Sequence, residues 1–258
     1  MHEVPAHLIE PLKQLLLSIA DDKLMLGHRN SDWTGLAPIL EEDIAFSAIA
    51  QDEIAHAQAL YELIGSLTGE RADDIAFGRE IGAYRCAQIV EPGDGFDWGV
   101  ALVRQLFCDH FDAMRLARAA QSAYKPLADL AARLVAEERV HVEHADTWLV
   151  RLGRGTGESH DRLQRAVYQL LPLAPSLFEP VEGQDDLEQA SLYPPSADLY
   201  SAWRVEVGTT LERANLRVEF PAQLPTERGG RRGIHTPALA ELLDEMCEVY
   251  RTEPGAAW

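Results

Sequence analysis

The stretch LEEDIAFSAIAQDEIAHAQALYELI, residues 40–64, decides the fold of this chain. Its apolar residues recur three and four positions apart, which is the spacing of one face of an α-helix. The middle of that face is interrupted by Glu53 and His56, a carboxylate and an imidazole three residues apart. The pattern predicts a helix over about residues 38–66 that points both polar groups toward the protein core.

A second helix, expected over about residues 126–152, repeats this arrangement. Its apolar face is interrupted in the middle by Glu138 and His141, again three residues apart. A single Glu-x-x-His pair on a helix is commonly a surface ion pair or a satisfied histidine. Two such pairs, each inside an apolar face, instead favour a shared buried site.

Two further helices are predicted at about residues 6–29 and 97–123, and each has one polar residue within its apolar face. These residues are Lys23 in the first helix and Asp109 in the second. The glutamate of the Glu-x-x-His pair follows 30 residues later in the first case and 29 in the second. The chain therefore reads as two similar helical hairpins.

These positions match the ligand pattern of four-helix di-metal proteins, which take a carboxylate from each of two helices and a Glu-x-x-His pair from each of the other two. The sixth position holds Lys23, whose protonated ammonium cannot bind a metal. The other five positions carry suitable ligands: Glu53, His56, Asp109, Glu138 and His141.

Two interpretations of Lys23 follow. In the first, Lys23 substitutes for the metal charge in a buried ion-pair network with the carboxylates, and the metal site is vestigial. In the second, Asp21 or Asp22 turns inward and a metal is kept. We favour the first, because a shift of one or two residues rotates a side chain by about 100–200° around the helix.

The predicted fold class is all-α, a ferritin-like four-helix bundle with additional C-terminal helices. Residues 1–258 are expected to form one domain, with the bundle in residues 1–155 and a helical extension, residues 156–258, packed on it. Weaker patterns predict a loop over residues 221–233 and shorter helices at about residues 79–86, 160–178, 197–214 and 237–251.

Composition excludes several classes of function. The 258 residues carry 42 acidic and 23 basic side chains, and the net charge of -19 would repel nucleic acid and anionic membranes. The three cysteines lack any CxxC pairing, which argues against disulfides and thiolate metal sites. Because no signal peptide or apolar run of about 18 residues is seen, a cytoplasmic protein is expected.

Several polar residues lie off the apolar faces. His110, Glu143 and His144 are expected to face solvent or a partner. Arg231 and Arg232 stand in a glycine-rich stretch that lacks the strand–loop–helix context of a phosphate loop, so a solvated loop is expected there.

Five motifs distributed along the chain are characteristic of one family. They are DDKLMLGHRNSDW (21–33), GLAPILEEDIAFSAIAQDEIAHAQALY (35–61), RQLFCDHFDAM (104–114), TWLVRLGRGT (147–156) and GGRRGIHTPALAELLDEM (229–246). In these motifs the whole chain resembles the C subunits of the bacterial ring-1,2-phenylacetyl-CoA epoxidases, multicomponent monooxygenases of phenylacetate catabolism. The last motif is the most specific, because it distinguishes C subunits from the paralogous A subunits.

The resemblance implies a structural, non-catalytic subunit with no cofactor of its own. In that family the A subunit holds the di-iron centre and pairs with the C subunit as a heterodimer. A small B subunit bridges heterodimers, and a reductase supplies electrons from NADPH. The complex uses O2 to convert phenylacetyl-CoA into its ring-1,2-epoxide.

Two alternatives stay open at this stage. C subunits can lose the Glu-x-x-His pair of the second helix, whereas Glu53 and His56 are both present here. In the first alternative, the retained pair lets the chain bind iron or manganese at the five ligands named above and activate oxygen itself. An iron-storage relative of ferritin is the third hypothesis, which the tail of about 100 residues disfavours.

Overall fold

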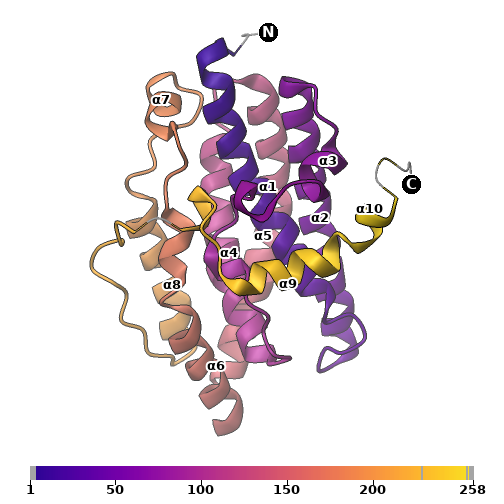
Figure 1. Ribbon diagram of the computed structural model, residues 1–258. Coiled ribbons are helices and arrows are strands. Elements are labelled where there is room, and N and C mark those ends of the chain that lie inside the picture. The colour runs from indigo at the N-terminus through magenta and orange to yellow at the C-terminus, as the bar shows by residue number, and fades with distance from the viewer. Residues whose placement is uncertain (1–3, 228, 254, 256–258) are drawn as a thin grey trace. The chain divides into compact units, whose positions relative to one another are not determined.

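The computed structural model describes residues 4–227, 229–253 and 255, and these residues form ten α-helices and several short 3-10 helices with no β-strand among them (Figure 1). The all-α class predicted from the sequence is confirmed. The chain divides into two compact units, and each contains one pair of long helices. Such hairpins of long helices are the parts from which ferritin-like bundles are built.

The first compact unit, called here the α1–α2 unit, comprises the described residues of the ranges 3–93, 179–189 and 227–258. Its long helices α1 (Ile9–Ser31) and α2 (Leu40–Thr68) lie side by side as a hairpin (Figure 1).

The two helices of this hairpin differ in burial. Every residue of α1 from 15 to 27 is buried. Helix α2 buries one face, which includes both Glu53 and His56. It ends at Gly69, which takes the left-handed conformation (φ 82°) that terminates helices and that glycine adopts without strain.

Shorter elements complete the α1–α2 unit. Helix α9 (Pro237–Met246) crosses α1 in Figure 1, and His28 on α1 lies 3.8 Å from Glu245 on α9. The remaining helices are α3 (Ala72–Phe77), α7 (Gln184–Gln189) and α10 (Glu248–Thr252), with the 3-10 helices η1 (Ala6–Leu8), η2 (Ile81–Ala83), η3 (Gln88–Val90) and η5 (Gly230–Arg232).

The position of the helix predicted at residues 79–86 is wrong. The α-helix lies earlier, at α3, and only the three-residue η2 falls within the predicted range. Gly78 follows the last helical residue, and beyond it the backbone is held by side chains instead of helical hydrogen bonds: the N–H of Arg85 donates to Asp21 over 2.6 Å. Helix α7 was not predicted.

The second compact unit, called here the α4–α5 unit, comprises Asp94–Phe178 and Ala190–Thr226. Helix α4 (Trp98–Ala119) begins at Asp97, whose side chain accepts the N–H of Gly99 over 2.8 Å. Helix α5 (Lys125–Gly153) carries Pro126 in its first turn, where a proline costs no helical hydrogen bond.

Two shorter helices pack on this second hairpin. Helix α6 (Gly157–Leu170) starts with a capping box formed by Thr156 and Ser159. Helix α8 (Leu199–Arg213) contributes Trp203, which is fully buried and donates its indole N–H to the carbonyl of Phe107 over 2.9 Å. The 3-10 helix η4 (Ala174–Phe178) completes the unit.

The four long helices lie within a few residues of their predicted bounds. Helices α8 and α9 fall within the weaker predictions, and α6 overlaps the one at residues 160–178 but starts three residues earlier. Residues 221–227 and 229–233 are a loop as expected, apart from η5, and residue 228 of the predicted loop lies outside the described residues. The interpretation of residues 1–258 as one domain stays a prediction.

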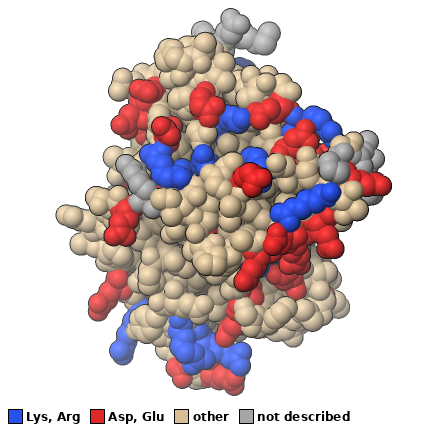
Figure 2. Space-filling model, in the orientation of Figure 1, with Lys and Arg blue, Asp and Glu red and all other residues tan. Residues whose placement is uncertain are grey.

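Charged side chains of both signs are interspersed on the face seen in Figure 2. Acidic groups also lie beside basic ones in surface ion pairs, such as Lys125 with Asp129 at 2.6 Å. In the part of the chain that the structure describes, no helix has the length and apolar character needed to cross a bilayer.

The close packing of α5 against the end of α8 predicts the effect of a single methyl group. A Cβ atom added at Gly153 would lie 2.3 Å from the carbonyl oxygen of Ala214. We expect Gly153→Ala to lower the free energy of unfolding by about 1–3 kcal/mol, because an overpacked site must shift its backbone. Urea unfolding followed by circular dichroism measures this. The matched control is Gly157→Ala on α6, where an added Cβ meets nothing within 4 Å; an equal loss there would contradict the explanation.

Candidate functional site

The middle of α1 carries three consecutive charged residues, Asp21, Asp22 and Lys23, and all three are buried. The ammonium of Lys23 lies 2.9 Å from one carboxylate oxygen of Glu53 on α2 and 3.1 Å from the other. Both side chains have no exposed surface. His56, one turn further along α2, is also buried. Lys23 therefore holds its charge against the carboxylate that the sequence proposed as a metal ligand.

Asp21 has three partners outside its own helix. The guanidinium of Arg79 approaches it with Nη1 at 3.1 Å and Nη2 at 2.5 Å, and Tyr61 donates its hydroxyl over 2.6 Å. The backbone N–H of Arg85 completes the set. Burial, and then the charge of Asp21, raise the pKa of Tyr61 far above its usual value. Burial opposes ionisation of Arg79, but the combined attraction of Asp21, Tyr61 and Tyr84 leaves the pKa of Arg79 above its usual value.

Asp22 is paired with Arg231 of η5. The two guanidinium nitrogens of Arg231 lie 2.9 and 2.7 Å from the two carboxylate oxygens of Asp22. The same Arg231 donates to the carbonyls of Ser18 and Arg85, and the N–H of Ala87 donates to Asp22 over 2.7 Å.

This pairing corrects the expectation of a solvated loop around Arg231. Arg231 is 2% exposed, because its guanidinium reaches inward to Asp22. The backbone N–H groups of Gly229 and Arg231 also bind the carboxylate of Glu179. Sequence reasoning missed Arg79 and Arg231 as partners of α1. The available signal was the Asp21–Asp22 pair itself, because two carboxylates on a helix that is otherwise buried require cations from elsewhere in the chain.

In the α4–α5 unit, Asp109 and Glu138 are also fully buried, each on its own helix. The side-chain amide of Gln105, one turn before Asp109, lies 2.7 Å from both of its carboxylate oxygens. On α5, Nδ1 of His141 is 3.9 Å from Oε1 of Glu138. The convergence of the five predicted ligands on one site stays a prediction, as does the ion-pair network that would join Lys23 to both carboxylates of this unit.

His110 on α4 is buried, which contradicts the expectation that it faces solvent or a partner. Its Nε2 lies 2.9 Å from Oδ1 of Asp146 on α5, and Thr210 on α8 donates its hydroxyl to the same oxygen over 2.9 Å. Burial opposes ionisation of Asp146, but the hydrogen bonds and charge of His110 and the Thr210 hydroxyl leave the pKa of that carboxyl below its ordinary value.

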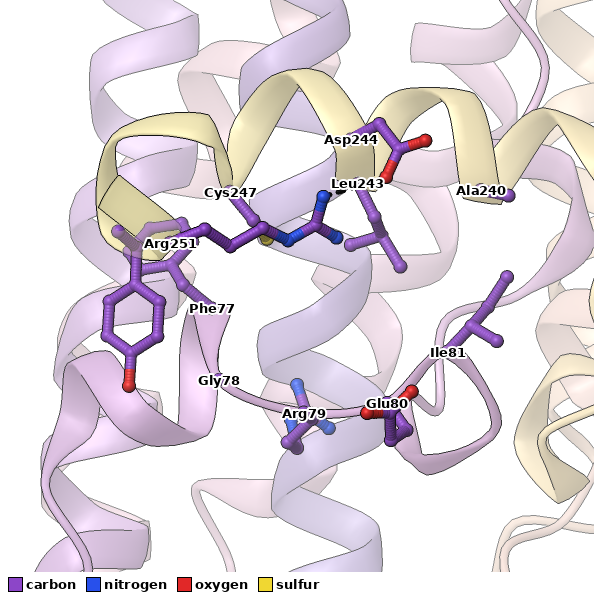
Figure 3. A pocket seen from close by; sticks show the side chains of 11 residues that line it. Phe77, Gly78, Arg79, Glu80, Ile81, Ala240, Leu243, Asp244, Cys247 and Arg251 are labelled. Atoms are coloured by element: carbon purple, nitrogen blue, oxygen red, sulfur yellow. Dashed lines mark hydrogen bonds and ion pairs between the residues drawn. The ribbon is translucent and has the colours of Figure 1, made fainter. Parts of the chain in front are cut away.

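A pocket of about 460 Å³ lies in the α1–α2 unit between the segment after α3 and helices α9 and α10. In Figure 3, Arg79 and Glu80 lie on one side and Leu243, Asp244 and Cys247 on the other. Charges of both signs line it, and its two guanidiniums have carboxylate partners. Arg79 binds Asp21, and Arg251 lies 2.8 Å from Asp244. The pocket therefore shows no preference for an anion or a cation.

Comparison with known proteins identifies the family. The sequence profile of the phenylacetic acid catabolic protein family matches residues 2–258. The chain belongs to this family. One relative is the C subunit of 1,2-phenylacetyl-CoA epoxidase from Escherichia coli (strain K12), which is 31% identical over 243 residues that cover 94% of this chain and 97% of that protein. The resemblance noted in the sequence motifs is thereby confirmed.

A di-iron centre is the cofactor that a ferritin-like member of the phenylacetic acid catabolic protein family would hold. The residues of α1 do not fit it. The inward residue is an ammonium in contact with Glu53, and both neighbouring carboxylates are bound by guanidiniums, so neither Asp21 nor Asp22 is turned toward a metal. Of the two sequence interpretations, the arrangement on α1 favours substitution of the metal charge by Lys23.

The Lys23–Glu53 pair makes a prediction about stability. We expect Lys23→Met to lower the free energy of unfolding by about 3–5 kcal/mol, because it leaves a carboxylate buried without this cation. The double variant Lys23→Met/Glu53→Leu should recover most of the loss, since an apolar pair of similar volume replaces a buried ion pair at little cost. Urea unfolding of the three proteins measures both effects.

The chain supplies a matched control for this experiment. Lys13 on α1 pairs with Glu70 just beyond α2 at 2.5 Å, but the two side chains are 20% and 46% exposed. Lys13→Met should change stability by less than about 1 kcal/mol, because solvent screens exposed pairs. Equal losses in the free energy of unfolding for Lys13→Met and Lys23→Met would contradict the explanation that burial makes the Lys23–Glu53 pair important.

Proposed function

We propose that this chain is the structural, non-catalytic C subunit of a phenylacetyl-CoA epoxidase in aerobic phenylacetate degradation. The observation that carries the proposal is the buried Lys23–Glu53 pair, which replaces a carboxylate by an ammonium at the centre of α1. Membership of the phenylacetic acid catabolic protein family and the likeness to the C subunit of the Escherichia coli epoxidase support it.

The chemical reason for the absence of catalysis is charge. Oxygen activation by two bridged irons needs several carboxylates to balance the cations. In this chain one proposed ligand, Glu53, already balances Lys23, and the carboxylates beside Lys23 balance two arginines. A ferric or ferrous ion near Nζ of Lys23 would meet a like charge, which favours a site without iron.

Within this proposal, residues 1–258 act as one ferritin-like domain that pairs with the catalytic A subunit. The A subunit holds the di-iron centre and the substrate, the B subunit bridges such pairs, and the reductase delivers electrons. The competing function is an oxygen-activating enzyme that uses Glu53, His56, Asp109, Glu138 and His141 as its own iron ligands. All five are buried, which favours this function.

Iron content separates the two functions. We expect the chain, produced alone in iron-replete cells, to contain far less than one equivalent of iron by elemental analysis and to lack an iron absorption band. In a complex reconstituted with the A subunit, B subunit and reductase, Glu138→Gln in this chain should leave epoxide formation close to that of the wild type. Stoichiometric iron that Glu138→Gln removes, together with loss of turnover, would establish the competing function.

The start of α2 supports the pairing with another subunit. Leu36, Leu40 and Ile44 are 58%, 70% and 63% exposed, and Leu40 and Ile44 lie one turn apart on the same face of the helix. Clustered exposed aliphatic side chains of this size are typical of protein–protein contacts.

We expect Leu40→Glu/Ile44→Glu to weaken binding to the A subunit by at least about tenfold, because two charges would be placed in an apolar contact. Calorimetry or surface plasmon resonance with the purified A subunit measures the effect. Val205→Glu on α8, where the valine is 65% exposed, is the control for a change of charge on an exposed aliphatic residue. Unchanged affinity in the double variant would assign the contact to another surface.

A further inference from the structure

Three side chains of different chemistry meet in the α1–α2 unit, in a place that the proposed function does not use. Cys86 and Glu91 come from the segment that follows η2, and His235 comes from the turn between η5 and α9. Nδ1 of His235 lies 2.8 Å from Oε1 of Glu91 and 3.9 Å from Sγ of Cys86. The side chains of Glu91 and His235 are 0% and 2% exposed, and Cys86 is fully buried.

The hydrogen bonds of His235 create a need for a cation. Its Nε2 lies 3.1 Å from the carbonyl oxygen of Tyr84, and because a carbonyl only accepts, Nε2 must carry the hydrogen. In a neutral imidazole Nδ1 then presents a lone pair, and it faces a carboxylate oxygen of Glu91 at hydrogen-bond distance. Two acceptors this close repel unless a proton or a metal ion lies between them.

A proton can lie between only two of the three groups, whereas a metal ion can bind all three. One sulfur, one nitrogen and one oxygen ligand atom of Cys86, His235 and Glu91 all lie within 4.8 Å of one another. Zinc binds such atoms at about 2.0–2.3 Å, so two ligands of one zinc ion are separated by about 3–4 Å. The separations of 2.8 Å from Nδ1 to Oε1 and 3.9 Å from Nδ1 to Sγ lie near this range, and a small opening of the Glu91–His235 contact would let all three atoms bind one ion.

The groups around the cluster already hold two of the ligands in the required orientation. The Nε2–H of His235 is bound to the carbonyl of Tyr84, which presents Nδ1 to the centre. The second oxygen of Glu91 accepts the N–H of Thr236 over 2.7 Å, which leaves Oε1 for the ion. Hydrogen bonds of this kind from a ligating histidine to a carbonyl, and to a ligating carboxylate, are usual around protein metal sites.

We propose that Cys86, Glu91 and His235 form a binding site for one divalent transition-metal ion of the zinc class, which fastens the segment after η5 to the segment after η2. The mixed sulfur, nitrogen and oxygen donors select zinc over magnesium or calcium, which prefer oxygen ligands alone. Zinc binds the thiolate form of Cys86 and an unprotonated Nδ1 of His235. Each ion that binds therefore releases to solvent both the thiol proton and the proton held between His235 and Glu91.

Cobalt(II) tests the proposal, because it occupies zinc sites and gives an intense near-ultraviolet band when bound by a thiolate. The tag-free full chain is stripped with EDTA and titrated with Co2+. The wild type should develop the thiolate-to-cobalt band to one equivalent, and added Zn2+ should abolish it. Cys86→Ser should lose the band. Cys247→Ser is the matched control, since Cys247 is a second buried cysteine of the same unit and should leave the band unchanged.

Two further measurements guard against misfolding and other metal sites. Circular dichroism of each variant in EDTA must match the wild type, and Zn2+ should raise the melting temperature of the wild type and of Cys247→Ser but not that of Cys86→Ser. Glu91→Gln should weaken zinc binding by at least about tenfold. No thiolate band in the wild type, or a band that survives Cys86→Ser, overturns the proposal. These experiments measure neither iron content nor epoxide formation, so their outcome does not bear on the proposed function.

Discussion

The α1–α2 unit depends on the burial of three adjacent charges in the middle of α1. An ionised side chain taken out of water is costly unless an opposite charge and hydrogen bonds meet it. Asp21, Asp22 and Lys23 meet that condition through three separate segments: Arg79 after α3, Arg231 in η5 and Glu53 on α2. Successive residues of a helix point about 100° apart, so the three partners approach α1 from three directions. The pairing thereby positions the hairpin, the segment after α3 and the C-terminal segment around one helix.

The same constraint bears on function. A ferritin-like metal site gathers carboxylates because the metal ions supply the balancing charge. In the α1–α2 unit the balancing charges belong to the protein itself, as an ammonium and two guanidiniums. The buried carboxylates of Asp21, Asp22 and Glu53 are thus each paired with a basic side chain. The proposed structural role in the epoxidase complex rests on this pairing of buried carboxylates with basic side chains.

The motif GGRRGIHT, residues 229–236, illustrates how one short segment joins distant parts of the unit. Its backbone binds Glu179, its arginine binds Asp22, and its histidine binds Glu91 and the carbonyl of Tyr84. A zinc ion at Cys86, Glu91 and His235 would add a second strong link between these segments beside the Arg231–Asp22 pair. Both links hold the segment that leads into α9. Helix α9 in turn lies against α1 through Glu245 and His28.

The sequence by itself determined the helical class, the four long helices and the inward direction of Glu53, His56, Glu138 and His141, because helical periodicity is a local property that each segment expresses alone. It also singled out Lys23 as the departure from a metal-binding pattern. Only the tertiary structure decided which charges pair. Arg79 and Arg231 lie 58 and 209 residues from their aspartates, and no local pattern marks an arginine as buried when its partner is that far along the chain. The misplaced helix at residues 79–86 has the same origin, since the backbone there is held by Asp21 of α1 and not by its own neighbours. Charge pairing across a fold depends on which segments meet in space, and no local pattern in the sequence shows which segments those are.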